Sequence, residues 1–161
     1  MNERTFVQSK ATNKRSEKRG IILSTETINH QINQGATIKK AKQFLKEYDS
    51  WHLTTLRLRQ ASQIRVLSPV EEKQLAKASF ECQVRQKTLD VMRETDDVSS
   101  LLADLLRWRY LCHWTVPKIC QQLADKYQLG YLSERTYMRY QNHAILNFAI
   151  LCPIDLLIQK N

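Results

Sequence analysis

The chain has 161 residues, of which only three are glycine and three are proline. Globular proteins contain about 12% of these two residue types together, so the composition argues against loop-rich β-sandwiches, collagen-like repeats and disordered linkers, and it favours long helices. The chain has 25 Lys and Arg against 16 Asp and Glu, which gives a formal net charge of +9. This balance favours a polyanionic partner, with nucleic acid as the first candidate.

Residues 1–35 are polar and basic, and they are predicted to form a weakly ordered N-terminal arm. Two interpretations of this arm remain open: a solvated tail, or an extension that contacts phosphates. The arm lacks an apolar stretch of signal-peptide length, and no run of about 18 apolar residues occurs in the chain. We therefore expect no membrane association and a cytoplasmic location.

Residues 36–95 have the pattern of a long antiparallel helical hairpin. From Thr37 to about Leu67 no glycine or proline interrupts apolar residues that recur at mostly helical spacing. The segment Ser68-Pro69-Val70-Glu71 then has the form of a capping box, which begins a second helix that runs to about Glu94. Since almost no loop separates the two helices, they are predicted to fold back on each other.

The apolar stripe of this hairpin includes the aromatic residues Tyr48 and Trp51. We expect both aromatics to pack within the hairpin or in contact with a second copy. The stripe is larger than two helices alone bury, which predicts a homo-oligomer or contact with another protein.

Three further helical segments follow a cluster of capping residues at 95–97. The first is expected over 98–112, and Thr115 is expected to cap the second. The second helix is predicted to run to about residues 127–128, after which Gly130 supplies a positive φ in the connection. Ser133 is expected to cap the last helix.

The last helix has two faces of different chemistry. Its apolar side comprises Tyr137, Tyr140, Ala144 and Phe148. Its other side, near the N-terminal half, is expected to be exposed and comprises Glu134, Arg135, Met138, Arg139 and Asn142. A DNA-recognition helix presents itself to the major groove in this way. Three helices with such stripes could also form a simple bundle, but the position of the two arginines away from the apolar stripe argues against it.

This region resembles a known family. A hydrophobic helix that ends in Arg109-Tyr110, a Trp114-Thr115 turn, an Ile-x-x-x-Leu helix over 119–123 and the sequence Ser-Glu-Arg-Thr-Tyr-x-Arg-Tyr over 133–140 together resemble the sigma-region-4-like helix-turn-helix of phage late-transcription regulators of the ArpU/RinA type. The resemblance covers roughly residues 96 to 150. It implies an all-α fold in which residues 96–161 form a helix-turn-helix DNA-binding domain with a C-terminal tail.

The resemblance and the helix faces together define the expected DNA contacts. Base reading is expected from Glu134, Arg135, Met138, Arg139 and Asn142. Phosphate contacts are expected from Thr115, Lys118, Gln122, Ser133 and Thr136. The chain departs from the commonest bacterial pattern in two places: Thr115-Val116-Pro117-Lys118-Ile119-Cys120 replaces Thr-x-x-Glu-Ile-Ala, and the connection between the last two helices is longer than a minimal turn.

Patterns that indicate an enzyme or a metal site are weak. Cys112, His113 and Cys120 lack a fourth ligand and the short paired spacing of a zinc module, and no Walker-type glycine loop or G-x-S-x-G occurs. We therefore expect no catalytic activity, no cofactor and no metal. The four cysteines include no C-x-x-C pair, so reduced and mostly buried thiols are expected.

The sequence thus predicts a sequence-specific DNA-binding regulator. The resemblance implies that it activates phage or prophage late genes in the cytoplasm of a bacterial host. Its expected partners are double-stranded DNA at a late promoter or operator and, as a further candidate, host RNA polymerase. Two alternatives remain open: a DNA-packaging protein similar to a small terminase, and a helical adaptor that binds RNA polymerase or another protein.

Overall fold

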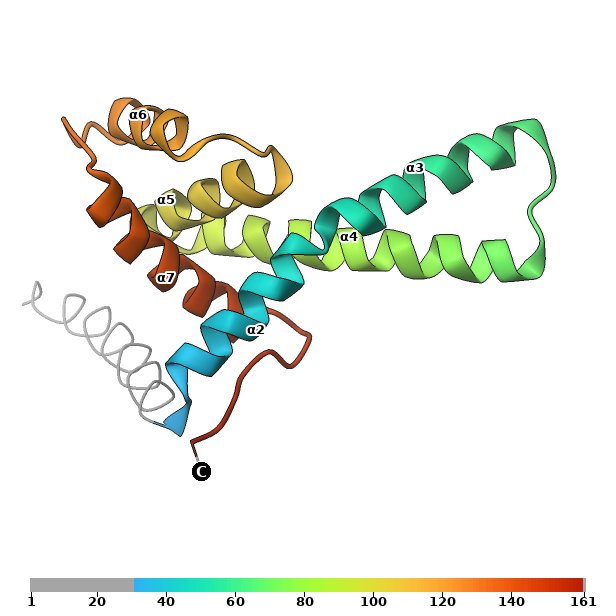
Figure 1. Cartoon of the computed structure of the whole chain (residues 1–161), viewed down its shortest axis with the longest axis horizontal. Helices are drawn as coiled ribbons and strands as arrows, with labels where there is room; N and C mark the ends of the chain where they lie inside the picture. Colours follow the sequence, from blue (N-terminus) through green and yellow to red (C-terminus); the bar gives the residue numbers. More distant parts are fainter. Residues whose placement is uncertain (1–30, 161) are drawn as a thin grey trace, which may run out of the picture.

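A computed structural model describes residues 31–160 of the chain. They form α2 (Gln34–Lys46), α3 (Tyr48–Ile64), α4 (Pro69–Thr95), α5 (Asp97–Leu106), the π-helical turn η1 (Arg107–Leu111), α6 (Val116–Lys126) and α7 (Glu134–Leu151) (Figure 1). Strand-like pairing within these residues is limited to an isolated bridge between Ile32 and Gln159. The predicted all-α class is confirmed.

The antiparallel hairpin and its capping box are also confirmed. The Ser68 hydroxyl accepts from the Glu71 amide at 3.3 Å, and the Glu71 carboxylate accepts from the Ser68 amide at 2.9 Å. Arg65 forms an ion pair with the same carboxylate at 2.5 Å, which closes the turn between α3 and α4. In Figure 1 these two helices extend away from the rest of the molecule, and we call residues 48–82 the projecting hairpin.

The first helix of the hairpin is not continuous, contrary to the prediction of one helix from Thr37 to about Leu67. It bends at Glu47, where α2 ends and α3 begins. In an unbroken helix the Phe44 carbonyl would accept from the amide four residues later. Here it accepts from Arg85 Nε of α4 at 2.8 Å. A contact between α2 and α4 therefore accompanies the bend. The sequence around Glu47 contains no glycine or proline that would indicate a bend there.

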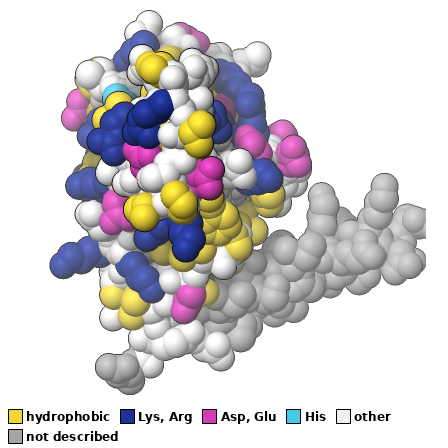
Figure 2. Space-filling view, turned by 90° about the vertical axis from the view of Figure 1, so that its right-hand side faces the viewer, with side chains coloured by type: hydrophobic (Ala, Val, Ile, Leu, Met, Phe, Trp, Pro, Cys, Tyr) yellow, Lys and Arg dark blue, Asp and Glu magenta, His cyan; other side chains and the backbone are white. Residues whose placement is uncertain are grey.

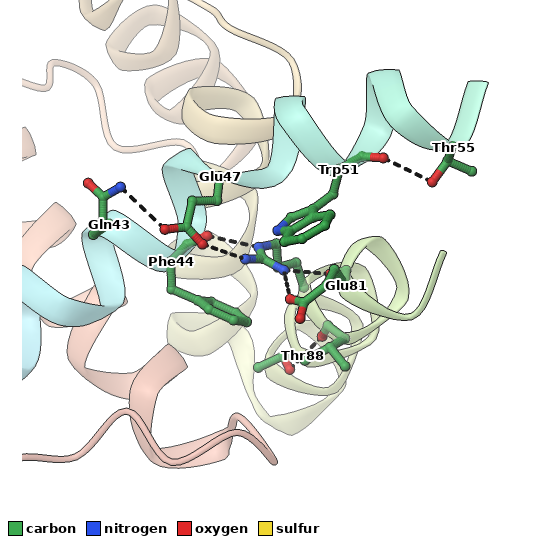
Figure 3. A network of polar contacts seen from close by, with 9 residues as sticks. Gln43, Phe44, Glu47, Trp51, Thr55, Glu81 and Thr88 are labelled. Atoms are coloured by element: carbon green, nitrogen blue, oxygen red, sulfur yellow. Dashed lines mark hydrogen bonds and ion pairs between the residues drawn. The ribbon is translucent and has the colours of Figure 1, made fainter. Parts of the chain in front are cut away.

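Arg85 is fully buried at this bend. Its partners Phe44, Glu47 and Glu81 surround it in Figure 3. Its Nη1 donates to the carboxylate and to the carbonyl of Glu81, both at 2.7 Å. Its Nη2 forms an ion pair with Glu47 at 3.5 Å, and the guanidinium lies 3.6 Å from the centre of the Phe44 ring. Removal of a charged partner would leave an uncompensated buried charge, so this network fixes the angle between α2 and α3.

One hydrophobic core crosses the predicted boundary near residue 95. Ala41 and Leu45 of α2 and Leu89 and Met92 of α4 belong to the same buried cluster as the apolar residues of α5, α6 and α7. The expected division between 36–95 and 96–161 therefore does not coincide with a division of the core. Among residues 31–160, the projecting hairpin extends beyond this core and has a seam of its own that includes Thr55, Leu58, Ala78 and Cys82.

The C-terminal tail docks on the start of α2. The Asn33 amide donates to the Ile158 carbonyl at 2.7 Å, and the Ile158 amide donates to Thr37 Oγ1 at 3.0 Å. The predicted weakly ordered arm, residues 1–35, lies outside the described residues as far as residue 30. Its last part is ordered, because Ile32 is buried and α2 begins at Gln34.

The helix predicted over 98–112 begins with a cap and ends in a π-helical turn. Asp96 caps α5 by accepting from the Ser99 amide at 2.8 Å. After Leu106 the chain widens into η1, in which the Cys112 amide donates to the Arg107 carbonyl at 3.0 Å. Such wide turns are rare and often occur at functional sites.

The four cysteines are free thiols, as predicted. Cys82, Cys120 and Cys152 are buried, and Cys112 is exposed. Burial raises the pKa of each of the three buried thiols above its ordinary value. These three side chains therefore act as small apolar groups of the interior.

Candidate nucleic-acid interface

The start of α7 is fixed by the predicted cap. Ser133 Oγ accepts from the Thr136 amide at 3.2 Å and lies 3.0 Å from Thr136 Oγ1. The two hydroxyls are thus already engaged with each other and with the helix terminus. A phosphate contact by either hydroxyl, as predicted from the sequence, would have to share these hydrogen bonds.

The two predicted faces of α7 are present in the structure. Tyr137, Ala144 and Phe148 are buried, and Tyr140 is half-buried. The predicted base-reading residues are all exposed; they are Glu134, Arg135, Met138, Arg139 and Asn142. Among the charged members of this set, neither Arg135 nor Arg139 forms an ion pair with a described residue, so both guanidinium groups are available to a ligand.

Only the N-terminal half of α7 is open to a ligand. From Ala144 onwards the helix is largely buried around its circumference, because α2, α4 and α5 all contact it. The buried residues include Ile145 and Leu146, which point in different directions from the helix axis. The exposed stripe therefore ends near Asn142, which matches the part of a recognition helix that contacts base edges in known complexes.

The preceding helix, α6, exposes the predicted phosphate contacts Thr115, Lys118 and Gln122. Their spacing of three and four residues places them on one side of the helix. Thr115 occupies the N-cap position, but its side chain forms no capping hydrogen bond, which corrects the expected cap. In the connection to α7, Gly130 has the predicted positive φ of 73°, and Gln128 has a further positive φ of 54°.

Two stacked tryptophans connect η1 with the segment that precedes α6. The indole rings of Trp108 and Trp114 are 5.1 Å apart with an interplanar angle of 20°. Lys118 Nζ lies 3.9 Å from the centre of the Trp114 ring, and Lys126 Nζ lies 5.8 Å from that of Trp108. Lys118 thus has a structural partner in addition to its exposed charge, so its substitution would affect packing as well as any phosphate contact.

A buried carboxylate anchors the other end of α6. Asp104 of α5 accepts a hydrogen bond from Lys126 and another, at 2.7 Å, from the Tyr127 hydroxyl. Burial raises the pKa of Tyr127 to about 12. Arg93 of α4 lies 3.7 Å from the second oxygen of Asp104. The angle between α5 and α6 is therefore fixed by paired charges as well as by apolar contact.

Arg109 is a residue of this region to which the sequence assigned no role. It lies half-buried in η1 and donates to the Trp114 carbonyl at 3.3 Å. Burial raises the pKa of Tyr137 of α7 to about 12, and the positive charge of Arg109 partly opposes this rise. The sequence signal was weak, because a π-helical turn places side chains at spacings that a helical pattern does not anticipate.

The described residues offer little for other kinds of site. Between residues 31 and 160 no three His, Cys, Asp or Glu side chains gather as a metal ion would require. In the same part of the chain, every helix is too short or too polar to cross a lipid bilayer. Comparison of the chain with family models, curated proteins and solved structures finds no match.

Proposed function

We propose that the chain is a sequence-specific DNA-binding regulator that reads bases with the N-terminal half of α7. The observation that supports this most is the exposed stripe of α7, in which Arg135 and Arg139 lie one turn apart without ion-pair partners among the described residues. An arginine in the major groove pairs with guanine O6 and N7 through two hydrogen bonds. The rest of α7 is packed in the core, which keeps this stripe rigid.

We assign phosphate contacts to the exposed residues of α6, and Lys118 is the main candidate because it carries a positive charge. The net charge of +9 supports a polyanionic partner. The two tryptophans and Asp104 hold α6 in place relative to α5, so a phosphate contact by α6 would also orient α7 on the duplex.

The biological setting rests on the resemblance of residues 96–150 to phage late-transcription regulators. We propose activation of late genes in the cytoplasm of a bacterial host, with host RNA polymerase as a further partner. Self-association remains a prediction of the sequence, and it would give repeated half-sites in the target DNA.

A selection from a random-sequence duplex library tests DNA binding and does not require that an operator sequence be chosen beforehand. Immobilised full-length protein is expected to enrich a defined sequence, which it should bind at least about 1,000-fold more tightly than random DNA, as is typical of specific binders. Arg135→Ala and Arg139→Ala are expected to lower affinity for the enriched sequence and to leave random-DNA affinity almost unchanged.

Arg59→Ala is the matched control, because it removes an exposed arginine of the projecting hairpin with no ion pair to a described residue. It should not change the ratio of specific to random affinity. If the library yields no preferred sequence although the protein binds DNA, the proposal is wrong and a packaging role similar to a small terminase is favoured. Failure to bind DNA at low salt would favour the adaptor function, which the exposed apolar residues of α3 support.

A further inference from the structure

The outer face of α3 exposes large apolar side chains to solvent. Leu53 is 64% exposed, Leu56 is 49% exposed and Ile64 is 79% exposed. Single exposed apolar residues are common on protein surfaces, whereas several on one helix face make that face a candidate binding surface. We call Leu53, Leu56, Gln60 and Ile64 the α3 stripe.

Helical spacing shows that the α3 stripe faces away from α4. Tyr48, Thr55 and Leu58 are buried and define the inner face of α3. At 100° per residue, the stripe residues point in nearly the opposite direction from this inner face. The positions 53, 56, 60 and 64 follow the three-and-four spacing with which amphipathic helices contact each other. The stripe is thus a helix face without a partner in the described part of the chain.

Two exposed arginines of α3 flank the stripe. Within the projecting hairpin, Arg57 and Arg59 are exposed on α3 on either side of the stripe, whereas Lys73 and Lys77 belong to α4. The acidic residues of the hairpin are Asp49, Glu71, Glu72 and Glu81, of which Asp49 pairs with His113 and Glu81 pairs with Arg85. Glu71 is already paired with Arg65. Arg57 adjoins the stripe and has no ion-pair partner among residues 31–160. Figure 2, which views the molecule from the side of the hairpin turn, shows apolar and basic side chains next to each other, with acidic side chains among them.

We infer that the α3 stripe binds an acidic amphipathic helix of a partner protein. Leucine-like side chains of that helix would cover Leu53, Leu56 and Ile64. Its flanking carboxylates would pair with Arg57 and Arg59. A second copy of this chain fits less well. An antiparallel pairing of two stripes places Arg57 of both copies near the middle of the interface, where like charges repel.

This inference does not depend on the proposed DNA-binding function. The stripe lies on α3 of the projecting hairpin, and the exposed half of α7 belongs to the other part of the molecule (Figure 1). The two surfaces share no residue, so one ligand could occupy each surface at the same time. A peptide-binding test contains no DNA, and its outcome is separate from that of the library selection.

The experiment uses fluorescence anisotropy of three synthetic peptides of about 18 residues, long enough to form helix on a surface. The first has a leucine stripe flanked by glutamates, the second has the same stripe flanked by lysines, and the third has the composition of the first with the leucines scrambled. We expect full-length protein to bind the first peptide at least about tenfold more tightly than either of the others.

Substitutions locate the binding surface. Leu53→Ser and Leu56→Ser are each expected to weaken binding of the first peptide about tenfold, and Arg57→Glu to weaken it about five- to tenfold. Phe80→Ser and Lys73→Glu are the matched controls. Both residues are exposed, and their spacing from the buried Ala78 and Cys82 places them on the side of α4 away from α3. Each control should change the affinity less than about twofold.

Several results would overturn the inference. Equal binding of the scrambled acidic peptide would show simple attraction to a basic protein, and equal binding of the lysine peptide would remove the charge argument. Equal effects of Phe80→Ser and Leu56→Ser would place the peptide elsewhere. Sedimentation of the full chain that shows a dimer abolished by Leu56→Ser would identify a second copy as the occupant.

Discussion

Arg85 provides a quantitative test of how the buried charge beside the bend between α2 and α3 is compensated. Its guanidinium is fully buried, and its shortest contact to a carboxylate is to Glu81 at 2.7 Å. Glu47 pairs with it at 3.5 Å and is 45% exposed at its side chain, against 20% for Glu81. The informative perturbations are therefore Glu81→Gln, Glu47→Gln and Arg85→Met, together with the double variant Arg85→Met/Glu81→Gln.

The structure predicts their order. Removal of one partner from a buried ion pair lowers the free energy of unfolding by about 3–5 kcal/mol. Because Glu81 is partly exposed, we expect Glu81→Gln to lie at the lower end, at about 3 kcal/mol. Because the Glu47 contact is longer and more exposed, Glu47→Gln should lower the free energy of unfolding by only about 0–1 kcal/mol. Arg85→Met removes the buried charge but leaves the Phe44 carbonyl without its Arg85 donor, which costs about 1–3 kcal/mol. In the Arg85→Met background, Glu81→Gln should cost no more than about 0.5 kcal/mol.

Urea unfolding followed by circular dichroism at 222 nm measures these free energies, at one protein concentration because self-association would change the midpoint. The decisive quantity is the coupling between positions 81 and 85. If Glu81→Gln costs the same free energy of unfolding in the wild-type and Arg85→Met backgrounds, Arg85 and Glu81 do not stabilise each other, and Glu81 is not the main counter-charge of the buried guanidinium.

Three further predictions follow from the pKa shifts and the burial of side chains. Hydrogen bonds from Arg65 lower the pKa of Glu71 from 4.5 to about 2. The ionised Glu71 carboxylate therefore stabilises the fold fully above pH 4.5, and this effect is lost as the pH falls through 2. In urea titrations, the stability difference between wild type and Glu71→Gln should disappear over that range. Burial raises the pKa of Tyr127 and Tyr137 from 10.0 to about 12, so their stabilising effect is lost as the pH rises from 10 through 12, and absorbance at 295 nm should show these two phenols ionising near pH 12. Among the four cysteines only Cys112 is exposed, so one thiol should react rapidly with Ellman's reagent and Cys112→Ser should remove that fast phase; two or more fast thiols would contradict the burial of the others.

The features predicted correctly depend on residues that are close in sequence. The capping box at Ser68, the cap at Ser133 and the positive φ of Gly130 are each decided within a few residues of the chain. The division of α7 into a buried and an exposed face follows from helical spacing alone. Local chemistry and periodicity were sufficient for these features.

The features that were missed depend on partners far along the chain. The bend at Glu47 involves Arg85, 41 residues away from the Phe44 carbonyl that it contacts. The stack of Trp108 on Trp114 occurs next to a π-helical turn. The spacing of apolar residues in the sequence does not predict such a turn. The predicted boundary near residue 95 failed as a core boundary for the same reason, because α2 and the end of α4 bury their apolar residues against α5 and α7.

The central claim is that α7 reads bases. A double-mutant cycle that combines one side-chain substitution with one base-pair replacement tests it most directly. In the DNA sequence enriched from the library, each G·C pair is replaced in turn, and the affinity of wild type is compared with those of Arg135→Ala, Arg139→Ala and the control Arg59→Ala. The account predicts that one replacement costs wild type about 1–3 kcal/mol, and that either Arg135→Ala or Arg139→Ala abolishes this cost at that pair while Arg59→Ala retains it. If both α7 variants discriminate every base pair as well as wild type does, α7 is not the recognition helix.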